Sequence, residues 1–174
     1  MLPDGVELHR LEPHPDSRGV FTELFRDSWA LPVAPVQWNV VRSNANVLRG
    51  VHAHVRHLDY LTIIAGRATI GLHDLRDDSP TEGLGTTVEV NEDEPTAISI
   101  PTGVAHGFYF PESSLHVYAV SREWDPADEL GCRWDDPALD IAWPCESPVV
   151  STRDEELGSL NELRAAVQAA LATA

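Results

Sequence analysis

The chain has 174 residues, a formal net charge of −16 at pH 7, and only arginines among its twelve basic residues. A chain of this length can bury a core without disulfides, and its acidity excludes the proteins that bind nucleic acid through a basic surface. The absence of lysine excludes every mechanism that depends on a lysine side chain.

Location and redox state follow from two further properties. The chain has no apolar run of membrane-spanning length, and its first residues, MLPDGVELHR, lack the basic and hydrophobic regions of a secretion signal. These absences predict a cytoplasmic protein with no membrane partner. Cys132 and Cys145 are expected to be free thiols, because a single pair of cysteines does not make a zinc motif.

Short segments with alternating or β-branched apolar residues recur along the chain and are separated by Gly, Pro, Asp and Ser. This pattern is typical of an all-β sandwich or barrel. We therefore predict an all-β fold, with a jelly-roll barrel as the leading candidate. The predicted strands are Val6–Leu11, Val20–Phe25, Val36–Arg42, Val47–Val55, Tyr60–Ala65, Ala68–Asp74, Thr86–Val90, Ala97–Ile100, His106–Phe110 and Leu115–Val120.

The chain changes character after the last predicted strand. Residues 121–156 are rich in tryptophan, proline and acids, and we expect an ordered loop that wraps the barrel and shields its tryptophans. Ser159 and Glu162 have the spacing of a capping box, which predicts a short C-terminal helix over residues 157–174. We therefore expect a single domain of residues 1–174, with the barrel core at about residues 16–120.

Titratable side chains concentrate in the stretch LRGVHAHVRHLDYLTIIAG, residues 48–66. Groups that titrate near neutral pH are costly inside a sheet unless they are hydrogen-bonded or functional. Because residues two apart share a face of a strand, His52 and His54 should point the same way. Arg49 lies in the same apolar strand, where a guanidinium needs an anion or a carboxylate partner.

Four other residues have a structural and a functional explanation, and the sequence alone leaves both open. Arg18 is either a solvated turn charge or a fork that grips a phosphate or carboxylate. His106 and Tyr118 are either satisfied core groups or members of a site. Asp154 is either an exposed charge at a helix N-terminus or a functional carboxylate.

Taken together, several motifs resemble the dTDP-4-dehydrorhamnose 3,5-epimerase family of sugar-nucleotide enzymes. They are DSRGVFTELF, VQWNVVRSNANVLRGVH, DLRDDSPTEG, IPTGVAHGF, and DPADELGCRWDDPALDIAWP followed by STRD. They occur in order from about Asp16 to Asp154, and their conjunction is far more specific than any one motif. The resemblance implies a cupin-type jelly-roll barrel.

The resemblance also implies acid–base chemistry on a nucleotide sugar without a cofactor. His52 would remove a proton beside the 4-keto group, Asp154 would orient His52, and Tyr118 would return a proton to the opposite face of the sugar. Family members are generally homodimers with exchanged strands, so an N-terminal segment such as Val6–Leu11 could pair across a two-fold axis. Substrate-binding roles are implied for Arg18, Phe21, Glu23, Gln37, Asn39, Arg49, His106 and Glu129.

The sequence departs from the family pattern at three positions. Asp59 replaces the lysine that stabilises the enolate oxygen, His54 replaces a glutamine, and Trp124 replaces a second tyrosine. Stabilisation of a developing oxyanion is typically worth about 3–4 kcal/mol, so its loss would slow enolisation by orders of magnitude unless it is replaced.

These departures support two alternative functions. His52, His54, Asp59 and His106 approximate the ligand set of metal-binding cupins, and three imidazoles with one carboxylate suit a divalent transition metal. Such a metal would act as the Lewis acid that the lysine no longer provides. The other alternative is a protein that binds a sugar nucleotide without turning it over.

Overall fold

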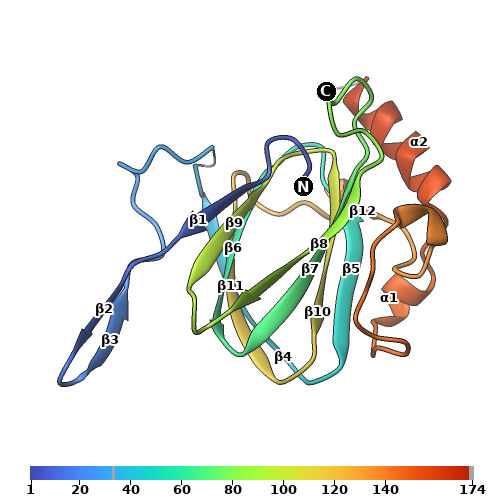
Figure 1. Cartoon of the computed structure of the whole chain (residues 1–174). Coiled ribbons are helices and arrows are strands. Elements are labelled where there is room, and N and C mark those ends of the chain that lie inside the picture. Colours follow the sequence, from blue (N-terminus) through green and yellow to red (C-terminus); the bar gives the residue numbers. More distant parts are fainter. Residues whose placement is uncertain (33, 173–174) are drawn as a thin grey trace.

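Two five-stranded antiparallel sheets form the body of the protein in a computed structural model that describes residues 1–32 and 34–172 (Figure 1). Sheet 1 has the order β1 (Glu7–Arg10), β9 (Thr96–Ile100), β6 (Asp59–Ala65), β11 (Ser114–Val120) and β4 (Gln37–Ser43). Sheet 2 has the order β12 (Leu130–Gly131), β5 (Val47–Ala53), β10 (Val104–Phe110), β7 (Arg67–Asp74) and β8 (Gly85–Asn91).

The main core contains side chains from both sheets. Leu61 and Ile63 of sheet 1 lie in one buried cluster with Ile70, Leu72 and Phe110 of sheet 2. Strands β6 and β7 are also covered on their outer faces, which explains why they are buried along most of their length. The predicted all-β fold therefore holds, and the segments predicted as strands all contain strands of similar extent.

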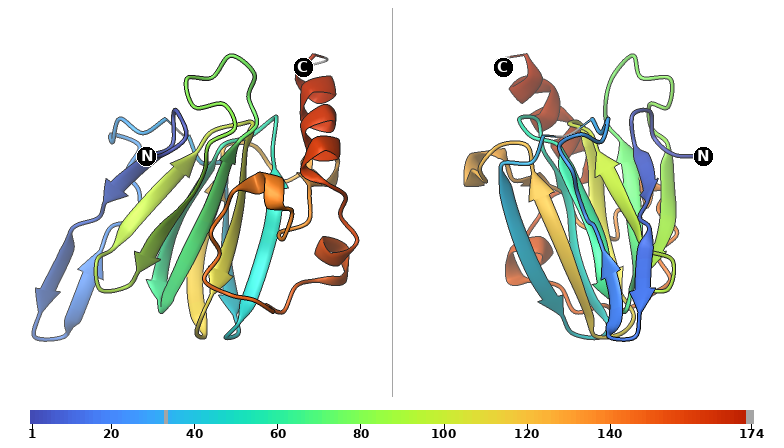
Figure 2. Two further views of the ribbon diagram at one scale, coloured as in Figure 1. Left: turned by 45° about the vertical axis from the view of Figure 1, so that its right-hand side comes forward. Right: turned by 90° about the vertical axis from the view of Figure 1, so that its left-hand side faces the viewer.

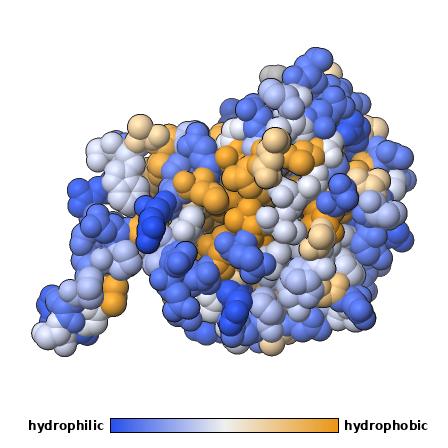
Figure 3. Space-filling view, viewed as in Figure 1, coloured by the Kyte–Doolittle hydropathy of each residue, from blue (hydrophilic) through white to orange (hydrophobic). Residues whose placement is uncertain are grey.

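A hairpin of β2 (Pro13–Asp16) and β3 (Gly19–Thr22) forms a separate two-stranded sheet. It projects beyond the barrel in Figure 1 and in the left view of Figure 2, and its surface is mostly hydrophilic in Figure 3. The barrel core predicted for residues 16–120 is thus wrong at its start, because β1 lies in sheet 1 whereas the hairpin lies outside both sheets. β1 pairs with β9 of its own chain and is an edge strand of sheet 1, so its expected pairing across a two-fold axis stays a prediction.

Residues 121–156 wrap the outer face of sheet 2, as predicted, but they are not all loop. They contain β12, which pairs with β5, and two turns of 3-10 helix, η1 (Pro126–Asp128) and η2 (Pro137–Leu139). They also contain the short helix α1 (Thr152–Glu155). Trp134 and Trp143 pack over this face of sheet 2, but Trp124 is 49% exposed, contrary to expectation.

The C-terminal helix α2 (Leu160–Leu171) begins with the predicted capping box between Ser159 and Glu162. Leu163 and Val167 of this helix are buried in a cluster with Val51 and Ala53, so α2 covers the outer face of β5 (Figure 2). The last two residues of the predicted helix, 173–174, lie outside the described residues. No helix in the described part of the chain is long and apolar enough to cross a membrane, and both cysteines are free.

Candidate active site

A cavity of about 480 Å³ lies between the two sheets. Sheet 2 contributes residues of β5 and β10 to its lining, and sheet 1 contributes residues of β4, β6 and β11. Its titratable lining residues are Arg49, His52, His54, Asp59, His106, His116, Tyr118, Glu129, Arg153 and Asp154.

A bulge in β5 places Arg49 and His52 in the same cavity. His52 pairs with His106 and Arg49 pairs with Phe108, so β5 has one more residue than β10 between these two pairs. The bulge contains Gly50, whose φ is +114° and where a Cβ would lie 2.8 Å from the Cα of Gly107. Only glycine fits this approach, which gives the LRGxH pattern a structural reason. The side chain of Arg49 lines the cavity but is exposed, not buried among core residues as the sequence suggested.

His52 and Asp154 form the shortest pair of ionisable groups in the cavity. The Nε2 of His52 lies 2.7 Å from the Oδ1 of Asp154, although the residues are 102 positions apart. The backbone N–H of Asp154 donates to Ser151 Oγ, the N-cap of α1. Burial raises the pKa of Asp154, but hydrogen bonds from His52, Ser151 and Gly50 outweigh burial and leave this pKa below its usual value. A charged carboxylate only accepts, so Nε2 carries the proton and Nδ1 of the neutral ring is free to take one.

Glu129 lies on the other side of the His52 ring. Its Oε2 is 3.9 Å from His52 Nδ1. The Nε1 of Trp124 donates to its Oε1 at 2.9 Å, and Arg153 Nη1 donates to its Oε2 at 3.2 Å. These contacts fix a second negative charge beside the ring, which stabilises the imidazolium that forms when His52 is protonated.

Tyr118 faces the cavity from β11, in the sheet opposite to that of His52. Burial raises the pKa of its phenol, and the charges of Asp59 and Glu129 act in the same direction. Its hydroxyl has no hydrogen-bond partner within the described residues. It therefore enters the cavity protonated at neutral pH and free to donate to a bound molecule.

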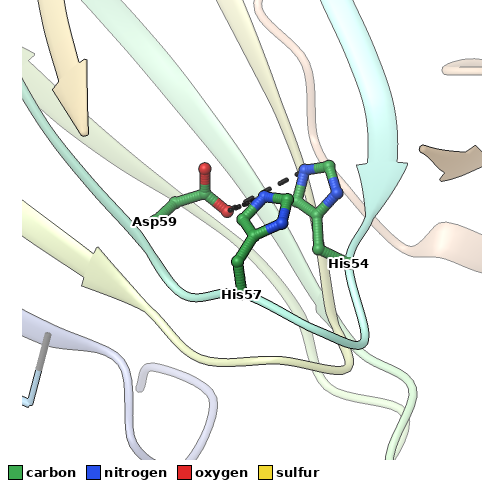
Figure 4. A group of neighbouring side chains, drawn as sticks. All are labelled: His54, His57 and Asp59. Atoms are coloured by element: carbon green, nitrogen blue, oxygen red, sulfur yellow. Dashed lines mark ion pairs between the residues drawn. The ribbon is translucent and has the colours of Figure 1, made fainter. Parts of the chain in front are cut away.

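Three imidazoles surround the carboxylate of Asp59. The Nε2 atoms of His54 and His57 each lie 3.8 Å from Asp59 Oδ2, and that of His106 lies 3.7 Å away. Figure 4 shows that His54 and His57 point toward the same oxygen. Burial raises the pKa of Asp59 to about 7, and burial lowers the pKa of His106 well below its usual value.

This arrangement changes the metal-ligand set expected from the sequence. His57 lies beside Asp59, whereas His52 directs its Nε2 to Asp154. His57 lies between β5 and β6, where neither strand periodicity nor a family motif distinguishes it. Its only sequence signal is its position two residues before Asp59 in the histidine-rich stretch.

The residues predicted to bind substrate fall into three groups. Arg49, His106 and Glu129 line the cavity. Gln37 and Asn39 lie on β4, and Asn39 pairs with Tyr118. The remaining three lie away from the cavity of their own chain, on or just after the projecting hairpin, and they are Arg18, Phe21 and Glu23.

Sequence comparisons place this geometry among known proteins. A family model described as dTDP-4-dehydrorhamnose 3,5-epimerase matches residues 2–162. The spore coat polysaccharide biosynthesis protein SpsL of Bacillus subtilis is 34% identical over 147 residues, which cover 82% of this chain and 97% of that protein. The dTDP-4-dehydrorhamnose 3,5-epimerase of Pseudomonas aeruginosa is 34% identical over 153 residues, which cover 81% of this chain and 83% of that enzyme.

Solved structures agree with the sequence comparisons. A dTDP-6-deoxy-D-glucose-3,5-epimerase from Legionella pneumophila, in complex with dTDP-4-keto-L-rhamnose, matches with a TM-score of 0.86 at 28% identity and covers 94% of this chain and 92% of that one. A 3'-monoepimerase from Streptomyces bikiniensis, in complex with dTDP-quinovose, matches with a TM-score of 0.84 at 28% identity, covering 98% and 91%. These matches confirm the resemblance and the cupin-type jelly roll that it implied.

Proposed function

The chain belongs to the dTDP-4-dehydrorhamnose 3,5-epimerase family, and we propose that it is an isomerase that epimerises a dTDP-4-keto-6-deoxy sugar at C3, C5 or both. The observation that carries this proposal is the pair of His52 and Asp154 in one wall of the cavity, with Tyr118 in the other.

His52 is the proposed base. Its Nδ1 takes a proton from the carbon beside the 4-keto group, and the electrons of that C–H bond pass to the carbonyl oxygen to give an enolate. Asp154 holds the ring in the tautomer that leaves Nδ1 unprotonated, and it stabilises the imidazolium that forms.

Tyr118 is the proposed acid. Because it belongs to the opposite sheet, its O–H reaches the face of the enolate away from His52, and donation of its proton to the carbon inverts that centre. Exchange with solvent then removes the proton from His52 and returns one to Tyr118. These proton transfers use side chains alone, so no redox cofactor takes part.

Arg49 is the proposed anchor for the substrate diphosphate. Its Nε donates to Ser43 Oγ at 3.0 Å, and the guanidinium forms no ion pair within the described residues, which leaves its charge available. A guanidinium matches the geometry of phosphate oxygens and supplies local positive charge in an acidic protein.

We propose that the protein is a homodimer in which the projecting hairpin reaches the cavity of the partner subunit. Phe21 on the hairpin is 63% exposed, and Val36 and Val40 beside or on the edge strand β4 are 60% and 64% exposed. Pairing two copies through these surfaces would bury apolar side chains and bring Arg18 and Phe21 to the nucleotide. A cytoplasmic location remains a prediction.

The test is hydrogen exchange on the sugar. Incubation with dTDP-4-keto-6-deoxyglucose in D₂O should incorporate deuterium at C3 or C5, as followed by NMR. The His52→Ala variant, once circular dichroism shows that it is folded, should lose this exchange. The Tyr118→Phe variant should retain a larger fraction of the exchange rate than of the rate at which inverted product forms. If ligand raises the melting temperature but no related 4-keto sugar exchanges hydrogen, the protein is a binding protein and the proposal is wrong.

A further inference from the structure

We propose that His54, His57, His106 and Asp59 form a binding site for one divalent transition metal ion, separate from the pair of His52 and Asp154. These four residues are called the imidazole cluster below. The ligand atoms offered by His54, His57 and Asp59 all lie within 4.8 Å of one another, and His106 Nε2 lies 3.7 Å from Asp59 Oδ2.

The distances suit coordination better than direct hydrogen bonding. The three Nε2 atoms lie 3.7 to 3.8 Å from Asp59 Oδ2, beyond hydrogen-bond distance. Ligand atoms of a tetrahedral zinc ion, at about 2.0–2.2 Å from the metal, lie on the order of 3.4 Å apart. The distances from Asp59 Oδ2 to the three Nε2 atoms are therefore within a few tenths of an ångström of the separation between two ligand atoms of one metal ion.

Each imidazole is held by its other ring nitrogen. The Nδ1 of His54 lies 3.0 Å from the backbone oxygen of Asp128, and that of His106 lies 3.1 Å from the backbone oxygen of Val104. The Nδ1 of His57 lies 3.1 Å from Asp128 Oδ2. A carbonyl oxygen cannot donate, so His54 and His106 carry their protons on Nδ1 and present the Nε2 lone pair to Asp59. Histidines that bind metals are held in this way.

Asp59 lacks another cationic partner. Within the described residues its ion pairs involve only these histidines, and no arginine approaches it. A buried carboxylate that faces nitrogen lone pairs has neither a donor nor a counter-charge, and a divalent cation supplies the missing charge for all four groups.

The site also borders the reaction cavity, because His54, Asp59 and His106 line it. Through the proposed function, the ion would replace the positive charge of the lysine that Asp59 displaces and would stabilise the enolate oxygen as a Lewis acid. His52 would stay unligated and remain the base.

Metal titration of the whole protein tests the site without any substrate. Tag-free protein is stripped with a chelator and titrated with Co²⁺, whose visible absorption reports coordination, and zinc content is measured after reconstitution and dialysis. We expect about one equivalent of metal, and His57→Gln should weaken binding at least about tenfold. Asp59→Asn is a second variant of nearly the same shape and should weaken it likewise.

His73→Gln is the matched control. His73 is also buried and also directs Nδ1 to a backbone oxygen, that of Leu139 at 2.8 Å, but it forms no ion pair with a carboxylate within the described residues. Its loss should leave metal affinity unchanged. Equal Co²⁺ affinity in the wild type and both cluster variants, or none in the wild type, overturns the site.

Exchange in D₂O with and without Zn²⁺ separates the site from its role. Faster exchange in the metal-loaded protein supports the Lewis-acid role, and metal binding with unchanged exchange overturns that role. Absence of exchange in both forms contradicts the epimerase proposal while the binding result still decides the site.

Discussion

Asp154 determines which nitrogen of His52 is available as a base. The carboxylate of Asp154 accepts a hydrogen bond from Nε2 at 2.7 Å, and the carboxylate of Glu129 lies 3.9 Å from Nδ1. The ring is thus held between two carboxylates, of which only one makes a short hydrogen bond. Its position depends on a segment far along the chain, since α1 brings Asp154 to β5.

Replacing Asp154 by asparagine should slow catalysis and change substrate binding much less. The amide keeps the shape but no longer accepts from Nε2 as a carboxylate does, so the wrong tautomer of His52 is favoured. We expect kcat to fall by about 10⁴-fold, with a smaller change in KM. Steady-state kinetics on the same 4-keto sugar measures this, with Glu155→Gln on the same short helix as the control.

A loss of less than about tenfold in Asp154→Asn would show that Asp154 does not orient the base. The same outcome in Glu155→Gln and Asp154→Asn would attribute the effect to α1 as a whole, since the control residue is exposed.

The roles proposed for His52, Tyr118 and Asp154 could be predicted from the sequence through the family resemblance, and His52 and Asp154 lie in two of the motifs that carry it. His57 could not be found in this way. It becomes part of a cluster only because the turn between β5 and β6 folds its ring onto that of His54, with centroids 4.1 Å apart. Contacts made by turns depend on the surrounding tertiary structure, which no periodicity encodes.

At the scale of elements, the turn that follows β7 depends on one buried carboxylate. Asp74 is fully buried and accepts hydrogen bonds from Arg76, Ser79 and Thr81. Burial raises the pKa of Asp74, but these bonds more than offset burial and lower the pKa to about 2. The ordinary value is 3.8, so the charged form is favoured in the folded protein.

This shift predicts a pH-dependent stability. A depressed pKa stabilises the fold above the ordinary value and loses that effect as pH falls from about 4 to about 2, here amounting to about 2 kcal/mol. Asp74→Asn should lower the free energy of unfolding by about that amount at pH 7, and the deficit should shrink by pH 3. Urea unfolding at both pH values measures it, with the exposed Asp78→Asn as control; an equal deficit at both values would contradict the prediction.

Long elements were predictable and short ones were not. The strands from β4 to β11 carry alternating or β-branched runs, and α2 carries its capping box, so local pattern and tertiary packing agree. By contrast, β12 has two residues and α1 has four. Such short elements form only because neighbouring strands supply hydrogen bonds and caps. The sequence of residues 121–156 therefore predicts a loop.

At the scale of the whole molecule, β4 is an edge strand of sheet 1, and the hairpin of β2 and β3 pairs with neither five-stranded sheet. Val40 and Trp38 alternate with inward residues along β4 and are exposed on its outer face. An edge strand with exposed apolar side chains tends to pair with another chain. This is the surface through which the proposed dimer would form.

Val40→Glu should therefore convert the dimer to a monomer and reduce activity, because the hairpin of the partner would be lost from each cavity. Light scattering after size exclusion gives the mass directly. The control is Leu171→Glu on α2, an exposed leucine away from this edge, which should leave the mass unchanged. A wild-type protein that elutes as a monomer would refute the proposed assembly.

The link between His52 and Asp154 also sets an order of events during biosynthesis. All strands of both sheets except the short β12 have been made once β11 has been synthesised. His52 then still lacks its hydrogen-bond partner, because Asp154 lies well downstream in the chain. A chain that ends at residue 150 would lack Asp154, and it would also lack α2, whose Leu163 and Val167 are buried against Val51 and Ala53 of β5. The proposed base therefore acquires its carboxylate partner only when α1 is in place, after the strands of both sheets have been made.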